Sequence, residues 1–317
     1  MNNAKEVLVD TNIVRRIMEN DSYVLHSINA IQNDGYRFRI SDMSLFELLN
    51  SIHSQQSYYA LLNALYDYEI APIFKNVIPY FDKQYLDWFK KPQPITELKK
   101  QLFGSFCFSV STILADIAKS IILFLANKLT SDYSSEFYLY IVSILNEDIV
   151  THFNNVIAKS YFGNGELLRK RLPLEYRDLV LRVLTYHSLL LDKNTFTKQE
   201  FQKEYHKQDI KYANLSFKEI CTQLLKEEDI LFSNNPQNDE ADEMFLTEYI
   251  KNILCHNGEF NINDITDYIN FKYAFKFCEF YFTNDRKSMN KYEKYLTQQN
   301  IQNFINRSKN FTEKYRQ

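Results

Sequence analysis

Four acidic residues lie at or near the ends of expected strands or on the expected helices next to them: Asp10, Glu47, Asp267 and Asp285. If parallel strands bring such carboxylates to one edge of a sheet, they repel one another and take up protons unless a cation lies between them. Carboxylate oxygens are ligands that suit Mg²⁺ or Mn²⁺. An ion of this kind turns a bound water into a nucleophile and neutralises charge on a phosphate. The pattern therefore predicts metal-dependent hydrolysis of a phosphodiester bond.

Each of these acids also has a structural interpretation. Asp10 and Asp285 could be turn or N-cap residues. Glu47 follows Ser44 at the spacing of a capping box, and Asp267 could complement a helix dipole. The residue types alone leave both interpretations open.

The elements that would position these acids lie at the two ends of the chain. Residues 5–9 are expected to form a buried strand, 12–33 a helix, 36–40 a second strand and 41–54 a second helix. Near the other end the sequence predicts a helix, a strand with a turn, and a last helix, over 261–277, 278–285 and 286–311. Strands that alternate with helices favour a parallel sheet with crossover connections.

The middle of the chain has a different pattern. Between 57 and 255 no alternating strand is expected, and two capping-box spacings indicate helices, Thr197 with Glu200 and Ser216 with Glu219. The prediction is an α/β fold in which 1–56 and 256–317 form one parallel-sheet domain. The all-helical segment 57–255 is then an insertion in that domain.

Composition excludes several other classes of protein. The chain has only 5 glycines, which disfavours the glycine-rich loops that cradle phosphates, and its net charge of -3 is unlike that of a protein that coats duplex DNA. None of the 4 cysteines has the C-x-x-C spacing of a zinc ribbon or redox motif. Asp116 and Lys119 interrupt the apolar stretch 103–129, so we expect a buried helix there and no membrane span. No secretory signal is recognised, and a cytoplasmic location is expected.

Three segments together resemble the PIN-domain nucleases: VLVDTNIV at 7–14, SDMSLFELL at 41–49 and DYINFKYAFKFCEFYFTND at 267–285. The resemblance covers about the first 55 and the last 60 residues. It implies a PIN-like fold, endonuclease activity on RNA in preference to DNA, and products with a 5′-phosphate and a 3′-hydroxyl. It also implies that Asp10, Glu47, Asp267 and Asp285 bind Mg²⁺ or Mn²⁺.

The resemblance has further implications and one departure. Asn12 and Thr283 are expected to orient the carboxylates or the water, and Asp264 is either a fifth ligand or only a helix-terminal charge. PIN domains of minimal size connect the glutamate and the third acid through a few dozen residues. Here Glu47 and Asp267 are 220 positions apart, so substrate choice does not transfer from small relatives.

Basic residues near these motifs are candidates for contacts with nucleic acid. They are Arg15 after the first motif, Arg169, Lys170 and Arg171 in LLRKRL, and Arg286 in the last helix. The alternative for each is a solvated helix face.

A second ribonuclease motif overlaps the predicted insertion. Arg182 and His187 have the R-x4-H spacing of HEPN ribonucleases, although Val183 stands where those enzymes usually carry a polar residue. The alternative is that His187 packs within a helical bundle.

Several biological roles fit these patterns. A stand-alone ribonuclease of this kind would act as a toxin or a defence effector, and a DNA nuclease would use the same metal chemistry. The alternative is a silent or partner-regulated scaffold that acts through its helical insertion. A protein regulator or inhibitor and a homo-oligomer are both open, whereas a membrane partner is not expected.

Overall fold

The computed structural model describes residues 5–73, seven single positions at 99, 103, 107, 110, 111, 114 and 143, and then 151–157, 165–192, 195–224, 262–296 and 298–316. The chain divides into two compact units. The first unit comprises Met1–Phe106 and Ile265–Gln317, and the second comprises Cys107–Asp264.

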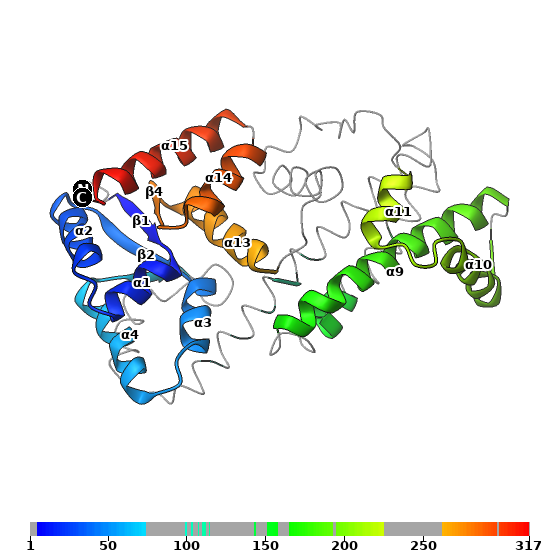
Figure 1. Ribbon diagram of the computed structural model, residues 1–317, viewed down its shortest axis with the longest axis horizontal. Helices are drawn as coiled ribbons and strands as arrows, with labels where there is room; N and C mark the ends of the chain where they lie inside the picture. Colours follow the sequence, from blue (N-terminus) through cyan, green and yellow to red (C-terminus); the bar gives the residue numbers. More distant parts are fainter. Residues whose placement is uncertain are drawn as a thin grey trace. The chain divides into compact units, whose positions relative to one another are not determined.

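The first unit is α/β and contains a four-stranded parallel sheet in the order β3-β2-β1-β4 (Figure 1). Its strands are β1 (Glu6–Val9), β2 (Arg37–Ser41), β3 (Ala71–Ile73) and β4 (Phe280–Phe282). Its helices are α1 (Thr11–Met18), α2 (Ser22–Asn33), α3 (Asp42–Asn50), α4 (Gln55–Asp67), α13 (Ile262–Phe277), α14 (Arg286–Tyr295) and α15 (Gln299–Lys314). The prediction of an α/β fold with a parallel sheet built from both chain ends is confirmed.

Strand β1 lies inside the sheet between β2 and β4. Its residues Val7, Leu8 and Val9 are fully buried, as expected of a parallel strand that is covered on both faces. Figure 1 shows blue β1 beside orange β4, although the two strands are far apart in the sequence. Hydrophobic burial therefore holds the two chain ends together.

The strand register fixes which residues share the carboxyl edge of the sheet. Val9 is paired with Phe282, so Asp10 follows at the level of Thr283, and the Asp10 N–H donates to the Phe282 carbonyl at 3.1 Å. On the other side of β1, Leu8 is paired with Arg39 of β2. Two residues further along both strands, Ser41 therefore lies at the level of Asp10. Ligands of parallel α/β sheets bind at this kind of edge.

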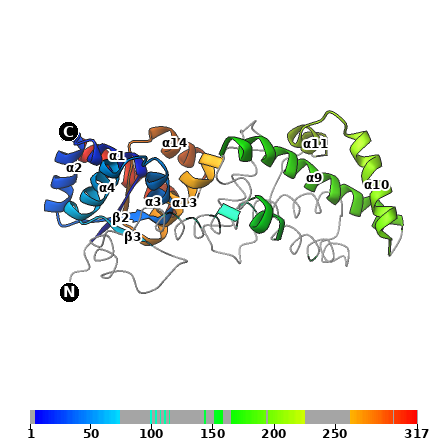
Figure 2. The same cartoon turned by 90° about the horizontal axis from the view of Figure 1, so that it is seen from below.

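Helices cover the sheet. Helix α15 lies along β4, where the ring of Phe311 stacks on that of Phe280 with centroids 4.3 Å apart. Helix α1 packs against α4, as the view from below shows (Figure 2).

Two expected helices are each divided in the structure. The expected helix 12–33 becomes α1 and α2, because Asn20 adopts a positive φ of 56° and Asp21 then caps α2 through its side chain. The expected helix 286–311 becomes α14 and α15, because Leu296 leaves helical geometry with a ψ of 90°. The chain is held in this turn by the Gln302 side-chain amide, which donates to the Leu296 carbonyl at 2.6 Å.

The expectation that no strand lies between 57 and 255 was wrong. Strand β3 pairs with β2 alone and stands at one end of the strand order. It has only 3 residues and contains Pro72. Proline is tolerated in edge strands, but so short a segment shows no alternation that would reveal it.

The described elements of the second unit are helical. They are the π-helix η1 (Phe153–Ile157) and the α-helices α9 (Gly165–Asp192), α10 (Lys198–Lys211) and α11 (Phe217–Leu224). Helices α10 and α11 both pack on α9. The predicted capping boxes are confirmed: Thr197 and Glu200 begin α10, and Ser216 and Glu219 exchange the corresponding bonds before α11.

The expected buried helix at 103–129 lies mostly outside the described residues. Among the helices that the structure does describe, none has both the length and the apolar character that crossing a membrane requires.

Candidate functional site

Asp10 is buried at the carboxyl end of β1 and accepts hydrogen bonds from three residues. The Thr11 backbone N–H donates to Oδ1 at 2.7 Å, which makes Asp10 the N-cap of α1. The Thr283 hydroxyl donates to Oδ2 at 2.6 Å, and the Asn12 side-chain amide donates to the same oxygen at 2.8 Å. The predicted roles of Asn12 and Thr283 as neighbours that orient this carboxylate agree with these bonds.

The surroundings of Asp10 disfavour its charged form. The pKa of its carboxyl group is raised from 3.8 to about 6, first by burial and then by the nearby carboxylates of Glu47 and Asp285. The bonds from Thr283 and Thr11 act in the opposite direction but do not compensate. A residue that only capped a helix at the surface would not carry this penalty.

Glu47 lies within α3 and faces the start of α1. Its Oε2 accepts the hydroxyl of Thr11 at 2.8 Å. The capping-box interpretation of Glu47 was wrong, because the N-cap of α3 is Ser41, whose hydroxyl accepts the Ser44 N–H at 2.9 Å. Glu47 is therefore free of a capping role and is tied to the segment that carries Asp10.

Asp285 and Asp267 meet through the hydroxyl of Ser288. Ser288 Oγ lies 2.9 Å from Asp285 Oδ2 and 3.3 Å from Asp267 Oδ2. A serine hydroxyl carries one proton, so it donates fully to only one of these carboxylates at a time. Asp285 also caps α14, and its own N–H donates to Thr283 Oγ1 at 3.0 Å, which links it to Asp10.

A buried contact joins α13 to the sheet edge, and the charges of the acids act on a buried ring beside it. The Ser41 hydroxyl donates to the side-chain oxygen of Asn270, one turn after Asp267. The phenol of Tyr281 on β4 has a pKa well above its ordinary value, first through burial and then through the charges of neighbours that include Asp10, Asp267 and Glu47. These acids therefore act on one buried ring.

The structure thus brings Asp10, Glu47, Asp267 and Asp285 to the carboxyl edge of the sheet from four separate segments. As their side chains stand, no three carboxylate, imidazole or thiol groups among the described residues lie close enough to form a metal site. Hydroxyl and amide donors occupy the carboxylate oxygens instead. One buried acceptor is left over, because Asn12 Oδ1 has no hydrogen-bond partner in the described part of the chain. The carboxylate oxygens and the unpartnered Asn12 Oδ1 are the kind of ligand atoms that fit a hard cation such as Mg²⁺ or Mn²⁺.

The predicted basic residues separate into the two units. In the first unit, Arg15 is exposed on α1, and Arg286 is exposed at the start of α14 directly after Asp285. In the second unit, Lys170 of α9 is exposed and pairs with Glu166 at 2.8 Å.

The remaining predicted residues are only partly described. Arg171 is exposed on α9. Arg169 lies on α9 and Asp264 on α13, but their side chains are outside the described part of the structure. The predictions for these two side chains therefore stay predictions.

The R-x4-H motif lies on α9. Arg182 Nε donates to Asp178 Oδ2 at 2.7 Å, and the Tyr205 hydroxyl donates to Asp178 Oδ1 at 2.5 Å. Asp178 thus ties Arg182 to α10, which gives the arginine a structural role. His187 is half-buried on the same helix.

Sequence reasoning missed three residues around the site. Thr11 belongs to the VDTN motif, so it could have been recognised from the motif itself. Ser288 follows Asp285 by three positions, the spacing at which a helix N-terminus meets its cap. Arg316, which contacts Asn284 of the strand-end turn at 2.8 Å, has no local signal because it lies 32 residues away.

Comparison of the chain with protein-family models, with curated proteins and with solved structures finds no significant match.

Proposed function

We propose that this protein is a metal-dependent endonuclease that hydrolyses phosphodiester bonds, most readily those of RNA. The observation that carries the proposal is the buried Asp10 carboxylate, whose pKa is raised to about 6, first by burial and then by the charges of Glu47 and Asp285. Placing like charges together is unfavourable for folding, and a cation that joins them turns this repulsion into binding.

The proposed ligands are Asp10, Glu47, Asp267 and Asp285, with Mg²⁺ or Mn²⁺ as the ion. A bound ion of this kind lowers the pKa of water and neutralises charge on the attacked phosphate. The chain's own residues fix the acids: the Thr283 hydroxyl and the Asn12 amide orient Asp10. Such outer hydrogen bonds set the direction of a ligand and tune its basicity.

The proposed reaction is a hydrolysis. The oxygen of water forms a bond to phosphorus, and the bond from phosphorus to the 3′ oxygen breaks. The products are a 5′-phosphate and a 3′-hydroxyl that receives a proton. RNA as substrate and the polarity of the products rest on the resemblance of three sequence segments to PIN-domain nucleases.

A cleavage assay tests the proposal. Purified full-length protein is incubated with 5′-labelled single-stranded RNA or DNA in Mn²⁺, Mg²⁺ or EDTA. Asp10→Asn and Asp285→Asn are compared with Asp67→Asn as a matched control. Asp67 is an exposed carboxylate of the same unit that precedes β3, so it lies at the opposite edge of the sheet.

We expect that the wild type cuts only in the presence of metal and that Asp67→Asn cuts equally well. The cleavage rate should fall by at least a hundredfold in Asp10→Asn and Asp285→Asn, in line with the cost of removing a group that stabilises a transition state. If the protein cuts DNA more readily than RNA, the proposed reaction stands but the substrate is DNA. Cutting that persists in EDTA, or in Asp10→Asn, would contradict the assignment of the site.

The proposed toxin or defence role has a separate test in cells. Expression of the wild-type chain is expected to arrest growth, and Asp10→Asn is expected to relieve the arrest. Equal toxicity of both chains would argue against a role that depends on cleavage.

A further inference from the structure

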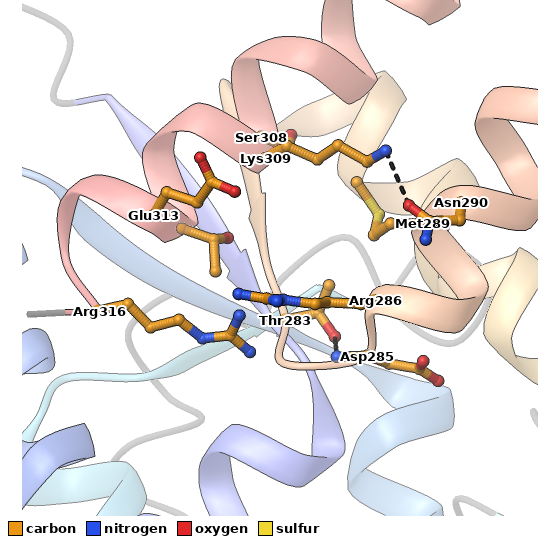
Figure 3. A pocket seen from close by; sticks show the side chains of 10 residues that line it. Thr283, Asp285, Arg286, Met289, Asn290, Ser308, Lys309, Glu313 and Arg316 are labelled. Carbon is orange, nitrogen blue, oxygen red and sulfur yellow. Dashed lines mark hydrogen bonds between the residues drawn. The ribbon is translucent and has the colours of Figure 1, made fainter.

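A pocket of about 270 Å³ lies between α14 and α15, next to the acidic edge. Thr283 and Asp285 line it and also belong to the hydrogen-bonded network of Asp10. Figure 3 shows Arg286 from α14 and Arg316 from the end of α15 reaching toward one another across this pocket.

The two arginines bring positive charge that no carboxylate neutralises by direct contact. Among the described residues neither Arg286 nor Arg316 forms an ion pair. Arg316 donates instead to neutral oxygens of Asn284, to Oδ1 at 2.8 and 3.1 Å and to the carbonyl at 3.3 Å. Lys309 at the pocket wall differs, because it pairs with Glu293 at 2.5 Å.

The surroundings of Arg316 disfavour its charged form. The pKa of Arg316 is lowered, first by its partial burial and then by the positive charges of Arg286 and Arg16. Glu313, which lines the pocket, offsets this only in part. Asp285 and Glu313 also line the pocket, but neither pairs with an arginine in the described part of the chain, and two guanidinium groups that face one pocket favour an anion there.

We propose that this pocket binds a phosphate group of the nucleic acid, held between Arg286 and Arg316 beside the acidic edge. The inference rests on the proposed nuclease function and names the part of the substrate that is bound. The pocket is slightly smaller than the roughly 300 Å³ at which sites for drug-sized ligands begin. It therefore suits a phosphate and part of a sugar, and not a whole nucleotide.

The ligand has two sources with the same chemistry, a backbone phosphate next to the cleaved bond and a terminal 5′-phosphate. Binding of 5′-phosphorylated and 5′-hydroxyl oligonucleotides of one sequence, as RNA and as DNA, distinguishes them. Fluorescence anisotropy is measured in EDTA, where metal-dependent cleavage is absent, over a range of salt concentrations.

The variants are Arg286→Gln, Arg316→Gln, the double variant, and Arg37→Gln as a matched control. Arg37 is exposed at the amino end of β2, at the opposite edge of the sheet. The side chain of Arg286 makes no hydrogen bond to another described residue, so Arg286→Gln keeps the test valid even if loss of the Arg316 bonds to Asn284 disturbs the fold.

We expect each single variant to bind about tenfold more weakly, because a charge-assisted bond to phosphate is lost. The slope of log affinity against log salt should fall by about 0.7, the value for one phosphate contact on a single strand. The double variant should lose little more slope than either single variant, because both arginines hold the same phosphate. Glu313→Gln should bind more tightly.

Several results would overturn the inference. One is that the arginine variants have the same affinity and salt slope as Arg37→Gln. Another is that the slope losses of the single variants add up in the double variant, as for two separate phosphate contacts. A third is that the protein binds no oligonucleotide. Equal losses on both kinds of 5′ end assign a backbone phosphate, and losses confined to the phosphorylated strand assign the terminal one.

The binding assay and the cleavage assay fail separately. Binding that depends on both arginines without any cleavage would keep the pocket and refute the nuclease function. If the wild type cleaves and Arg286→Gln binds and cuts as well as the wild type, the nuclease function stands and the phosphate-binding role of the pocket is refuted.

Discussion

Replacing Asp10 by asparagine should change how the stability of the sheet unit depends on pH. In the folded protein the Asp10 carboxyl has a pKa of about 6, against an ordinary value of 3.8. The folded state therefore binds a proton more tightly than the unfolded state between these values. Linkage then requires that stability falls as pH rises through this window, with the full penalty present above pH 6.

The size of the effect follows from the two pKa values. Their difference corresponds to about 3 kcal/mol, at about 1.36 kcal/mol for each pH unit. The asparagine has its own cost, because Thr11, Asn12 and Thr283 all donate to this side chain and one of them would meet an amide N–H. An unpaired buried donor costs about 1–3 kcal/mol, but this cost does not vary with pH.

The measurement is urea denaturation of both proteins in EDTA between pH 4 and 8. Hydrogen exchange of peptides that contain β1 serves as the readout, so that the second unit does not contribute. Relative to Asp10→Asn, the wild type should lose about 2.4 kcal/mol of the full ~3 kcal/mol between pH 4 and 7 and then remain nearly constant. Saturating Mn²⁺ should remove this loss in the wild type alone, because a bound cation favours the charged carboxylate.

A constant difference between the two proteins over this pH range would refute the reasoning, because Asp10 would then titrate normally. A wild type that gains stability over Asp10→Asn as pH rises would refute it more strongly. That result would mean that the charged carboxylate stabilises the fold, as a simple helix cap does.

Three other changes test separate parts of the site. Thr283→Val should raise the pKa of Asp10 above 6, because the hydrogen bond from the Thr283 hydroxyl lowers that pKa, whereas Thr283→Ser should leave the pKa near 6. A carboxyl ¹³C NMR titration measures the pKa in both variants. An unchanged pKa in the valine variant would contradict the role of the hydroxyl. Ser41→Ala should reduce the free energy of unfolding in urea by about 1–3 kcal/mol, because it removes the cap of α3 and leaves Asn270 without its donor; a change below about 0.5 kcal/mol would count against this contact. Arg182→Gln should leave RNA cleavage at the wild-type rate, and a loss of cleavage without loss of fold would instead indicate a second site.

The sequence by itself determined the elements whose physics is local. The apolar run at 7–9, the alternation at 36–40 and the capping boxes at Thr197 and Ser216 each predicted an element that the structure contains. The acids could be singled out because Asp10 and Asp285 follow strands, and Glu47 and Asp267 lie on helices next to the strands in the sequence. A carboxylate in such a place caps a helix or binds a ligand, and the sequence could not separate these roles.

Only the tertiary structure decided what the acids do to one another. Asp10 does cap α1, yet its raised pKa arises from burial and from Glu47 and Asp285, which are distant in the sequence. The three-residue β3 could not be predicted because it is supported by pairing with β2 and packing of α3, and not by a pattern of its own. Arg316 faces Arg286 only because α15 folds back along β4. Burial, strand register and charge repulsion act between distant segments, and local pattern contains none of them.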